Sequence, residues 1–431
     1  MFYSRELPVS GGYDVVVCGA GVAGFTAAVQ AARLGAKTAL VEKYGMPGGV
    51  MTVGGNNEIG LFYRGSRQII SGIGWELVTR LAEKGWAKIP EFDEKYDHSQ
   101  QNVIVNAPMA AAEMDEMCLE AGVELLYHHT LCDVMTENGR ITAAVTAAKE
   151  GMKAITGRYF IDATGDADLT FFAGFGTMLG DDGGKTLQPG TLRFYWSGCD
   201  MGKISREQVE KSFAKGLESG EIVRSDYWSL GGSPYTVFVA NGNNINHLDI
   251  NGADSVSRSG AETEGRRSVA RLAQWARKRV IGAENASPEI CAPEVAVRES
   301  RRAVGEHIIT AEEYVSGKEY DDGLCFSYYP VDLHTSGDST LYNIAVKKDT
   351  VPQIPYSALL VKDAENLLAV GKCASGDRLA HSAFRVKASC MAMGQAAGCA
   401  AALASLKNSG LRGISADSIR SELKNQGAIV P

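Results

Sequence analysis

Several chemical signatures are missing from this sequence, and each absence excludes a class of protein. The nine cysteines are an odd number and form no C-x-x-C pair, which argues against a disulfide framework and against a disulfide reductase. H-E-x-x-H does not occur and the seven histidines lack ligand spacing, so we expect no metal site. Acidic residues (51) outnumber basic ones (43), and the net charge of −8 makes nucleic acid an unfavourable partner.

Long hydrophobic segments are scarce as well. The N-terminal sequence MFYSRELPVSGGYD has no apolar core of a signal peptide. The longest apolar run, residues 390–406, is mostly alanine and glycine and contains Gln395, so it predicts a buried helix and no membrane span. These features predict a cytoplasmic chain whose cysteines are buried thiols.

Glycine is the residue in excess. It accounts for 49 of 431 residues, about 11% against roughly 7% in an average protein. The glycines cluster in short loops, which indicates close approaches of the backbone to a ligand. At a typical ~150 residues per domain the chain has room for two to three units, and two lobes sharing one cofactor fit this length.

The N-terminal region has the pattern of a β-α-β unit. Residues 13–18 (YDVVVC) are typical of a buried strand, and residues 25–34 have helical composition. A second buried strand is predicted over residues 37–41 and is closed by Glu42. Between the first strand and the helix lies the G-x-G-x-x-G sequence of residues 19–24, in the context that a dinucleotide-binding turn requires.

Each position of this motif has a physical role in holding a dinucleotide. Gly19 permits the tight turn, Gly21 lets a pyrophosphate approach the backbone, and Gly24 allows close packing of helix and strand. The free N–H groups at the start of the helix favour phosphate, and Glu42 is placed to accept hydrogen bonds from ribose hydroxyls. The alternative is an ordinary glycine-rich turn.

Three later features favour FAD over NAD. A glycine-rich stretch, residues 45–49, follows Glu42 where an NAD enzyme usually continues with further βα units. Strand-like runs with turn residues between them predict a β-meander that returns to a strand ending in Thr164-Gly165-Asp166. Residues 366–372 (NLLAVGK) predict another strand, ending at Gly371. The four runs of the meander are residues 123–128, 131–136, 140–147 and 152–163.

The remaining pattern predicts two domains. Helices are expected over residues 68–84 and 107–121. From residue 176 to 349, strand-like pieces (191–196, 235–239) alternate with charged amphipathic helices (262–279, 293–314). We therefore predict an α/β protein with a Rossmann-like FAD-binding domain (a parallel sheet with a β-meander) and a second α+β substrate or cap domain. The FAD-binding domain comprises residues 1–60, 105–175 and 350–431, and the cap domain residues 61–104 and 176–349.

The chain resembles the FAD-dependent oxidoreductases of the glutathione-reductase-like fold over almost its full length. The N-terminal motif is shared by many flavoproteins. The more specific motifs are RESRR (residues 298–302), VDLH (residues 331–334) and GQAAG (residues 394–398), and YFIDATGDAD (residues 159–168) and NINHLD (residues 244–249) also match. The sequence departs from the family at Lys372, where arginine is common.

The resemblance implies an FAD site with assigned residues. Gly19, Gly21 and Gly24, with the neighbouring Ala23, Glu42 and Lys43, would hold the ADP half. Gly48, Gly49 and Thr52 would lie along the ribityl chain and flavin, and backbone near Leu131 would meet adenine. Ala163, Gly165 and Asp166 would line the pyrophosphate side, and Gly371 would approach the isoalloxazine. A helix starting near Ser389 would point its positive end at the flavin.

Candidate catalytic residues are the histidines and arginines near the expected flavin. His381 is a candidate acid–base group and Arg385 a candidate substrate or flavin ligand; the alternative is that both only tie the loop. His334 and His247 are candidates on the second lobe, each with a structural alternative. In RESRR, helical spacing would place Arg298 on one face with Arg301 and Arg302. We favour an ion network there, with Arg298 as the best exception.

These features predict an FAD-dependent oxidoreductase that transfers hydride between flavin N5 and a small polar substrate bearing hydroxyl or carboxylate groups, sugar-like or a hydroxy acid. The alternatives are a non-catalytic FAD-binding protein and an NAD-dependent dehydrogenase. No second G-x-G-x-x-G follows a strand, so the electron acceptor or donor is left open. A homo-oligomer is also left open, because no residue argues for one.

Overall fold

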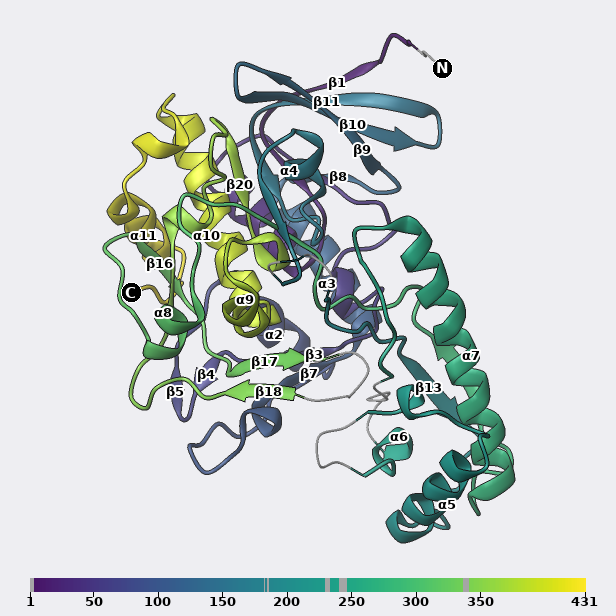
Figure 1. Ribbon diagram of the computed structural model, residues 1–431. Helices are drawn as coiled ribbons and strands as arrows, with labels where there is room; N and C mark the ends of the chain where they lie inside the picture. Colours follow the sequence, from purple (N-terminus) through teal and green to yellow (C-terminus); the bar gives the residue numbers. More distant parts are fainter. Residues whose placement is uncertain (1–3, 182, 184–185, 229–232, 240–245, 336–340) are drawn as a thin grey trace.

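The computed structural model describes residues 4–181, 183, 186–228, 233–239, 246–335 and 341–431 (Figure 1). Its centre is a seven-stranded sheet in the order β8-β2-β1-β11-β10-β9, with β20 also pairing with β11. The bounds are β1 (Val9–Cys18), β2 (Thr38–Val41), β8 (Glu124–Leu126), β9 (Thr130–Glu137), β10 (Arg140–Ala148), β11 (Gly151–Asp162) and β20 (Leu367–Ala369). The predicted α/β fold class with a Rossmann-like sheet is confirmed.

Strand β11 joins the two parts of this sheet. Its first half pairs antiparallel with β10, and its second half runs parallel between β1 and β20. The buried β-branched residues of β1 explain its central place, because Val15, Val16 and Val17 are fully buried. The C-terminal ends of β1 and β11 therefore lie side by side, and the motif turn at residue 19 starts there.

The first predicted strand of the meander belongs elsewhere. The run at residues 123–128 forms β8, which pairs parallel with β2 and extends the Rossmann part of the sheet. It follows the helix over residues 107–121, and a strand reached through a crossover helix joins its sheet in the parallel direction. The meander therefore consists of β9, β10 and β11.

Two long helices pack on each other beside the sheet. Helix α1 (Val22–Arg33) contacts α10 (Lys387–Leu406), and α2 (Ile73–Glu83) and α3 (Ala107–Ala121) pack nearby. Two glycines of α10 allow the approach: a Cβ on Gly394 would lie 2.0 Å from the carbonyl oxygen of Ala23, and one on Gly398 would lie 2.2 Å from that of Ala27. Among the described helices, α10 is long and apolar enough to cross a membrane, but 83% of its apolar stretch is buried inside the protein.

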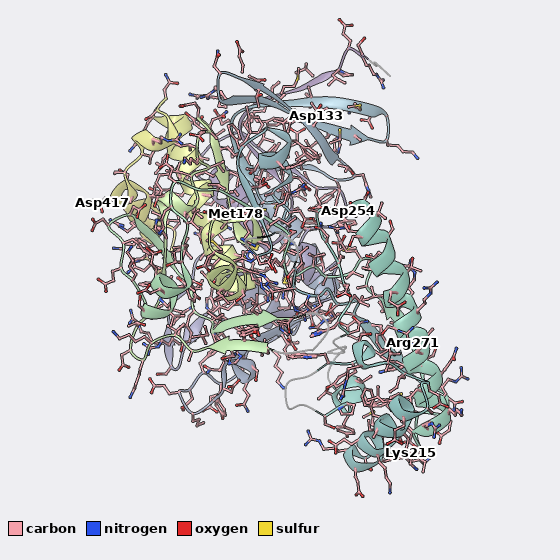
Figure 2. The ribbon with its side chains drawn as sticks, in the orientation of Figure 1. Asp133, Met178, Lys215, Asp254, Arg271 and Asp417 are labelled. Carbon is pink, nitrogen blue, oxygen red and sulfur yellow. The ribbon has the colours of Figure 1, made fainter. Side chains whose placement is uncertain are left out.

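A second hydrophobic cluster lies entirely between residues 192 and 297. It includes residues of β13 (Phe194–Ser197), α5 (Arg206–Glu218) and α7 (Ser255–Arg279). Strand β14 (Ser287–Cys291) pairs antiparallel with β13 beside this cluster. Helix α7 runs along one side of the molecule (Figure 1), and Figure 2 labels Asp254, just before its first residue, and Arg271 within it. Asp254 caps the helix and Arg271 pairs with Asp226. Residues from 61–104 pack in the same apolar cluster as α1 and α10, and the domain boundaries stay a prediction.

Shorter elements complete the described chain. The helices are α4 (Asp168–Phe172), α6 (Thr236–Val239), α8 (Ala311–Ser316), α9 (Arg378–Phe384) and α11 (Ala416–Asn425). The strands are β3 (Glu58–Ile59), β4 (Tyr63–Arg64), β5 (Arg67–Gln68), β6 (Ala87–Lys88), β7 (Val103–Val105), β12 (Thr177–Leu179), β15 (Arg301–Ala303), β16 (Gly323–Phe326), β17 (Val331–His334), β18 (Leu341–Ile344) and β19 (Gln353–Pro355). Asn244 and Ile245 of the NINHLD motif lie outside the described residues.

Two predictions for the second lobe are wrong. The helix predicted over residues 293–314 is instead extended chain, strand β15 and the short helix α8. Its charged residues find partners far away in sequence, so their spacing does not reflect a helical face. The strand predicted over residues 235–239 is instead the short helix α6. The hydroxyl of Tyr227, which precedes this helix, donates to the carbonyl of Ser233 and shares a hydrogen bond with the Thr236 hydroxyl.

The same substitution in two helices should have opposite effects on stability. Gly398→Ala places a Cβ against the backbone of α1, which cannot move without shifting the sheet, so we expect a loss of about 1–3 kcal/mol. Gly260→Ala on the exposed side of α7 meets open space, and we expect a gain of up to about 1 kcal/mol. Denaturant unfolding of both variants measures this, and equal effects would contradict the packing role of Gly398.

Candidate functional site

One cavity of about 1160 Å³ opens above the C-terminal ends of β1 and β11. It exceeds the roughly 300–1,000 Å³ of sites for drug-sized ligands, so it has room for a dinucleotide and a small molecule together. The motif turn, the loop after β2, the first turn of α10, the β17–β18 pair and the second lobe all line it. The residues that line the cavity therefore come from distant segments of the chain and from both lobes.

The glycines of the motif turn have distinct surroundings. Gly19 has a φ of +99°, and a Cβ there would lie 2.4 Å from the carbonyl oxygen of Ala163. A Cβ on Gly24 would lie 1.8 Å from the carbonyl oxygen of Gly19. Gly21, by contrast, lines the cavity, and a Cβ on it would meet no other atom of the protein within 4 Å. Gly21 therefore leaves open the space that a diphosphate needs at the start of α1.

Glu42 fixes this turn and faces the same cavity. Its Oε2 accepts a hydrogen bond from the N–H of Ala20 at 2.7 Å, and its Oε1 accepts one from the N–H of Tyr44 at 3.0 Å. Burial raises the pKa of Glu42, while these two N–H donors act against that rise. Each oxygen has a further lone pair, so the carboxylate can also accept a ribose hydroxyl.

A charged network borders the cavity next to the turn. Asp166 Oδ1 accepts from Lys372 Nζ at 3.0 Å and from Ser300 Oγ at 2.6 Å, and Oδ2 lies 3.2 Å from Arg258. Burial acts to raise the pKa of Asp166, but the two cations outweigh it and hold the pKa well below its usual range. Arg258 also pairs with Glu294 at 2.9 Å. The network thus joins the two lobes, since Arg258 comes from α7.

Most residues assigned to the cofactor by resemblance line this cavity. They are Gly19, Gly21, Ala23, Glu42, Lys43, Gly48, Gly49, Ala163, Gly165, Asp166 and Gly371. Gly24, Thr52 and Leu131 do not line it. Gly24 acts behind the turn, and the Thr52 hydroxyl donates to the carbonyl of Pro47 at 2.6 Å. The structure thus brings the predicted binding residues together at this cavity, with three exceptions. Gly24 and Thr52 support the loops beside it, and Leu131, at the expected adenine contact, does not line it.

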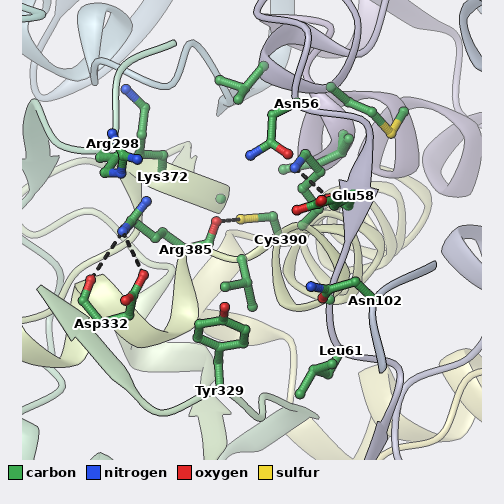
Figure 3. A pocket seen from close by; sticks show the side chains of 18 of the residues that line it. Asn56, Glu58, Leu61, Asn102, Arg298, Tyr329, Asp332, Lys372, Arg385 and Cys390 are labelled. Carbon is green, nitrogen blue, oxygen red and sulfur yellow. Dashed lines mark hydrogen bonds and ion pairs between the residues drawn. The ribbon is translucent and has the colours of Figure 1, made fainter. Parts of the chain in front are cut away.

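Two arginines predicted as catalytic candidates meet at the other end of the cavity. Arg298 donates to the carbonyl of Pro189 at 2.8 Å and to the Thr191 hydroxyl at 3.0 Å. Arg385 lies 3.7 Å from Asp332 and has a buried Nε without a partner (Figure 3). Burial, and then the nearby Arg385, lower the pKa of Arg298 to about 9.

The histidines at this end are neutral at physiological pH. His334 Nε2 lies 3.4 Å from Asp332, and burial followed by the charge of Arg298 lowers its pKa to about 4. His247 stacks on Trp228 with ring centroids 4.7 Å apart, and burial lowers its pKa to about 3. His334 and Trp228 line the cavity, whereas His247 lies behind them.

His381 does not reach the cavity. It is fully buried in α9, where Nε2 lies 3.0 Å from the carbonyl oxygen of Lys372 and the ring meets Phe384 edge-on. Burial holds its pKa well below the usual range. This placement corresponds to the alternative in which His381 ties the loop after Gly371.

The RESRR arginines point in different directions because the segment is not helical. Arg301 pairs with Asp168, and Arg302 pairs with the fully buried Glu299 at 3.1 Å. Only Arg298 of the three lines the cavity. The ion network expected from the sequence is therefore present, and the shared helical face is not.

Sequence reasoning missed several charged residues of the cavity. Arg193, Arg258, Asp332 and Lys387 all line it. Asp332 lies inside the VDLH motif, next to the predicted His334, and could have been chosen with it. Arg193, Arg258 and Lys387 carry no local signal, because their position depends on contacts between distant segments.

Comparison with known proteins gives a family match over nearly the whole chain. The family model for the FAD dependent oxidoreductase matches residues 14–423. A thiamine thiazole synthase of Aeropyrum pernix is 29% identical over 170 residues, which cover 36% of this chain and 56% of that protein. The dihydrolipoyl dehydrogenase of Trypanosoma brucei brucei is 53% identical over 47 residues, covering 11% of this chain and 10% of that protein. The chain thus aligns with little more than half of the first relative's length and with a tenth of the second's.

Solved structures are similar at low identity. A geranylgeranyl bacteriochlorophyll reductase-like protein of Thermoplasma acidophilum is 13% identical, with a TM-score of 0.47, over 97% of this chain and 83% of that chain. The GidA protein of Aquifex aeolicus is 14% identical, with a TM-score of 0.47, over 92% of this chain and 64% of that chain.

The fold and the cavity define a dinucleotide-binding protein. More specifically, the chain belongs to the family of FAD-dependent oxidoreductases. It is therefore an enzyme with FAD as its cofactor, as the sequence predicted. The glutathione-reductase-like group within this class stays a prediction.

Two glycine substitutions should separate cofactor binding from folding. Gly21→Ala adds a methyl group into open space at a φ of −59°, so we expect unchanged stability of the apoprotein and an FAD affinity at least about tenfold lower. Gly24→Ala drives a Cβ into the backbone and should lower apoprotein stability. Thermal unfolding of the apoproteins and FAD titration measure the two effects. Destabilisation by Gly21→Ala would contradict the open space beside this turn.

Proposed function

We propose that this enzyme transfers hydride between FAD and a small substrate that carries a carboxylate group. The observation that carries the proposal is an excess of buried positive charge at the end of the cavity remote from the motif turn. Arg298 and Arg385 lie there beside the single carboxylate of Asp332. His334 and His247 beside them are neutral and add no further charge.

The placement of FAD follows from the room beside Gly21. We infer that the turn at the start of α1 holds the diphosphate, Glu42 holds a ribose, and Asp166 with its partners lies along the linker. The flavin then extends past Gly49 and Gly371 toward the arginines. When bound, FAD supplies a ring that accepts or donates a hydride.

The charge balance favours an anionic substrate over a neutral sugar. A buried cation without a counter-ion loses its hydration without a compensating interaction. An incoming anion therefore stabilises an excess of guanidinium groups. Asp332 has its own pairs with Arg385 and His334, and although burial acts to raise its pKa, those partners bring it to about 2. The unpartnered Nε of Arg385 is a donor ready for a carboxylate oxygen.

The chain's own groups orient this substrate. Arg298 is held by the carbonyl of Pro189 and the hydroxyl of Thr191, so its guanidinium is fixed before the ligand arrives. Asp332 and Gln188 do the same for Arg385. Two guanidinium groups fixed in this way orient a carboxylate with little loss of side-chain entropy. The neutral Trp228 and His334 also line this end of the cavity, and both are buried.

The decisive experiment compares hydroxy acids with their neutral counterparts. Under anaerobic conditions, the flavin absorbance of the holoenzyme should bleach with one or more small hydroxy acids, while the matching amides and neutral polyols leave it unchanged. Equal reduction by neutral alcohols would contradict a carboxylate-bearing substrate. Bleaching by neither class, in enzyme that retains FAD, would contradict the proposed reaction in the oxidative direction. The reverse assay on reduced enzyme then tests oxo and unsaturated acids.

Loss of one guanidinium should weaken substrate use without loss of FAD. We expect Arg385→Met to raise the KM for the acid found in the screen by about 30-fold or more, since truncating a buried charge partner costs about 2–5 kcal/mol. The exposed Arg266→Met on α7 is the matched control and should behave as wild type. Steady-state kinetics with flavin content measured in parallel tests this. An unchanged KM would remove Arg385 from the substrate site.

A further inference from the structure

Lys387 is a charged residue of the cavity that the function proposed above leaves unused. It is the first residue of α10, and it lines the cavity together with Arg385 and Cys390. Its Nζ donates a hydrogen bond to the backbone carbonyl of Glu58 at 2.7 Å. Glu58 lies across the cavity from Asp332 in Figure 3. Among the described residues, no carboxylate forms an ion pair with Nζ. A lysine held by one neutral acceptor keeps two N–H positions for a ligand.

The groups around Lys387 come from three segments of the chain. Arg193 approaches from the segment before β13, Glu58 from β3, and Arg385 and Cys390 from either side of the lysine itself. Burial raises the pKa of Cys390 to about 12, so its thiol is neutral. Of the charged neighbours, Arg193 and Arg385 oppose the ammonium form and Glu58 favours it. Burial and then Arg193 lower the pKa of Lys387 to about 7.

The other titratable groups of this end are less suited to proton exchange. His334 is already neutral and its Nδ1 is sealed from solvent. Burial raises the pKa of Tyr329, so its hydroxyl stays protonated. Asp332 is an ionised partner of Arg385. A general acid or base works best when it can take both protonation states at the working pH.

We propose that Lys387 is the catalytic residue that exchanges a proton with the substrate. The proposal rests on the function proposed above and adds the acid–base group. In the oxidation of a hydroxy acid, the hydroxyl O–H bond breaks and its proton passes to the neutral amine of Lys387. The C–H bond breaks and its electron pair leaves as hydride to oxidised FAD, so that a carbonyl forms and the flavin is reduced. In the reverse direction the ammonium returns the proton.

The first test uses oxalate as a probe, because it carries carboxylates but has no C–H bond to donate as hydride. Its dissociation constant from the oxidised holoenzyme is followed through the flavin spectrum. Binding should weaken about tenfold between about pH 6 and about pH 8, because the ammonium form of Lys387 falls from roughly 90% to roughly 10% over that range. Lys387→Met should bind weakly at both pH values, and Lys387→Arg should bind at both without the pH dependence.

The second test measures anaerobic flavin reduction by the hydroxy acid found in the screen. The wild-type rate should rise as the pH increases through about 7, because the neutral amine is the base. Both Lys387→Met and Lys387→Arg should be at least about 100-fold slower, the arginine because it keeps its proton. Lys407→Met, at the exposed far end of α10, is the matched control.

The outcomes separate this proposal from the one it rests on. A wild-type rate and pH profile in Lys387→Met, or oxalate binding that is independent of pH in the wild type, would overturn the role of Lys387 and leave the oxidoreductase function standing. A holoenzyme that binds FAD but neither binds oxalate nor is reduced by hydroxy acids would overturn the anionic substrate and this proposal with it.

Discussion

The close packing of α1 against both β11 and α10 positions the whole site. On one side of α1, the missing side chains of Gly19 and Gly24 let the motif turn meet the end of β11 at Ala163. On the other side, Gly394 and Gly398 let α10 approach the backbone of α1. The open space at Gly21 and the first turn of α10 are therefore fixed relative to each other. One packing arrangement sets both the cofactor turn and the cations of the substrate site.

The cavity is divided into two regions by how its charges are compensated. Next to the motif turn, Asp166 and Glu294 are paired with Lys372 and Arg258, so this region is internally balanced before any ligand enters. At the far end, Asp332 is shared among cations that exceed it. A balanced network tolerates a ligand held by backbone N–H groups, whereas an unbalanced one requires a counter-ion. The two regions thus suit two different ligands in one cavity.

The sequence predicted the parts of the fold that depend on local pattern. The β-α-β unit at residues 13–41, the helix over residues 107–121 and the glycine turn follow from short-range periodicity and from conformations that only glycine adopts readily. The segment at residues 293–314 failed for the opposite reason. Its glutamates and arginines suggested an amphipathic helix, yet Glu299 is buried between Arg302 and Arg378, which lies 79 residues further along the chain.

In the candidate site, too, the residues within a local motif were predictable and those positioned by long-range contacts were not. The cofactor turn has a motif, and most of its residues could be chosen from the sequence. His381 was chosen by its proximity in sequence to Gly371. Its ring instead lies in the protein interior, where Nε2 is within hydrogen-bond distance of the carbonyl oxygen of Lys372. Lys387 gave no signal, because its pKa depends first on burial and then on Arg193, which is remote in sequence and comes from the second lobe. Properties that arise from such contacts require the folded chain.

The buried positive charge that favours an anion at this end of the cavity also determines which residue can exchange a proton there. Burial beside guanidinium groups opposes every cationic form, and it lowers the pKa of His334 from 6.5 to about 4 and that of Lys387 from 10.5 to about 7. The imidazole, which is suited to acid–base work in water, is thereby left neutral and weakly basic. The lysine, ordinarily too basic, is brought to physiological pH. In a pocket of arginines, a lysine therefore takes the role that a histidine has in a more neutral environment.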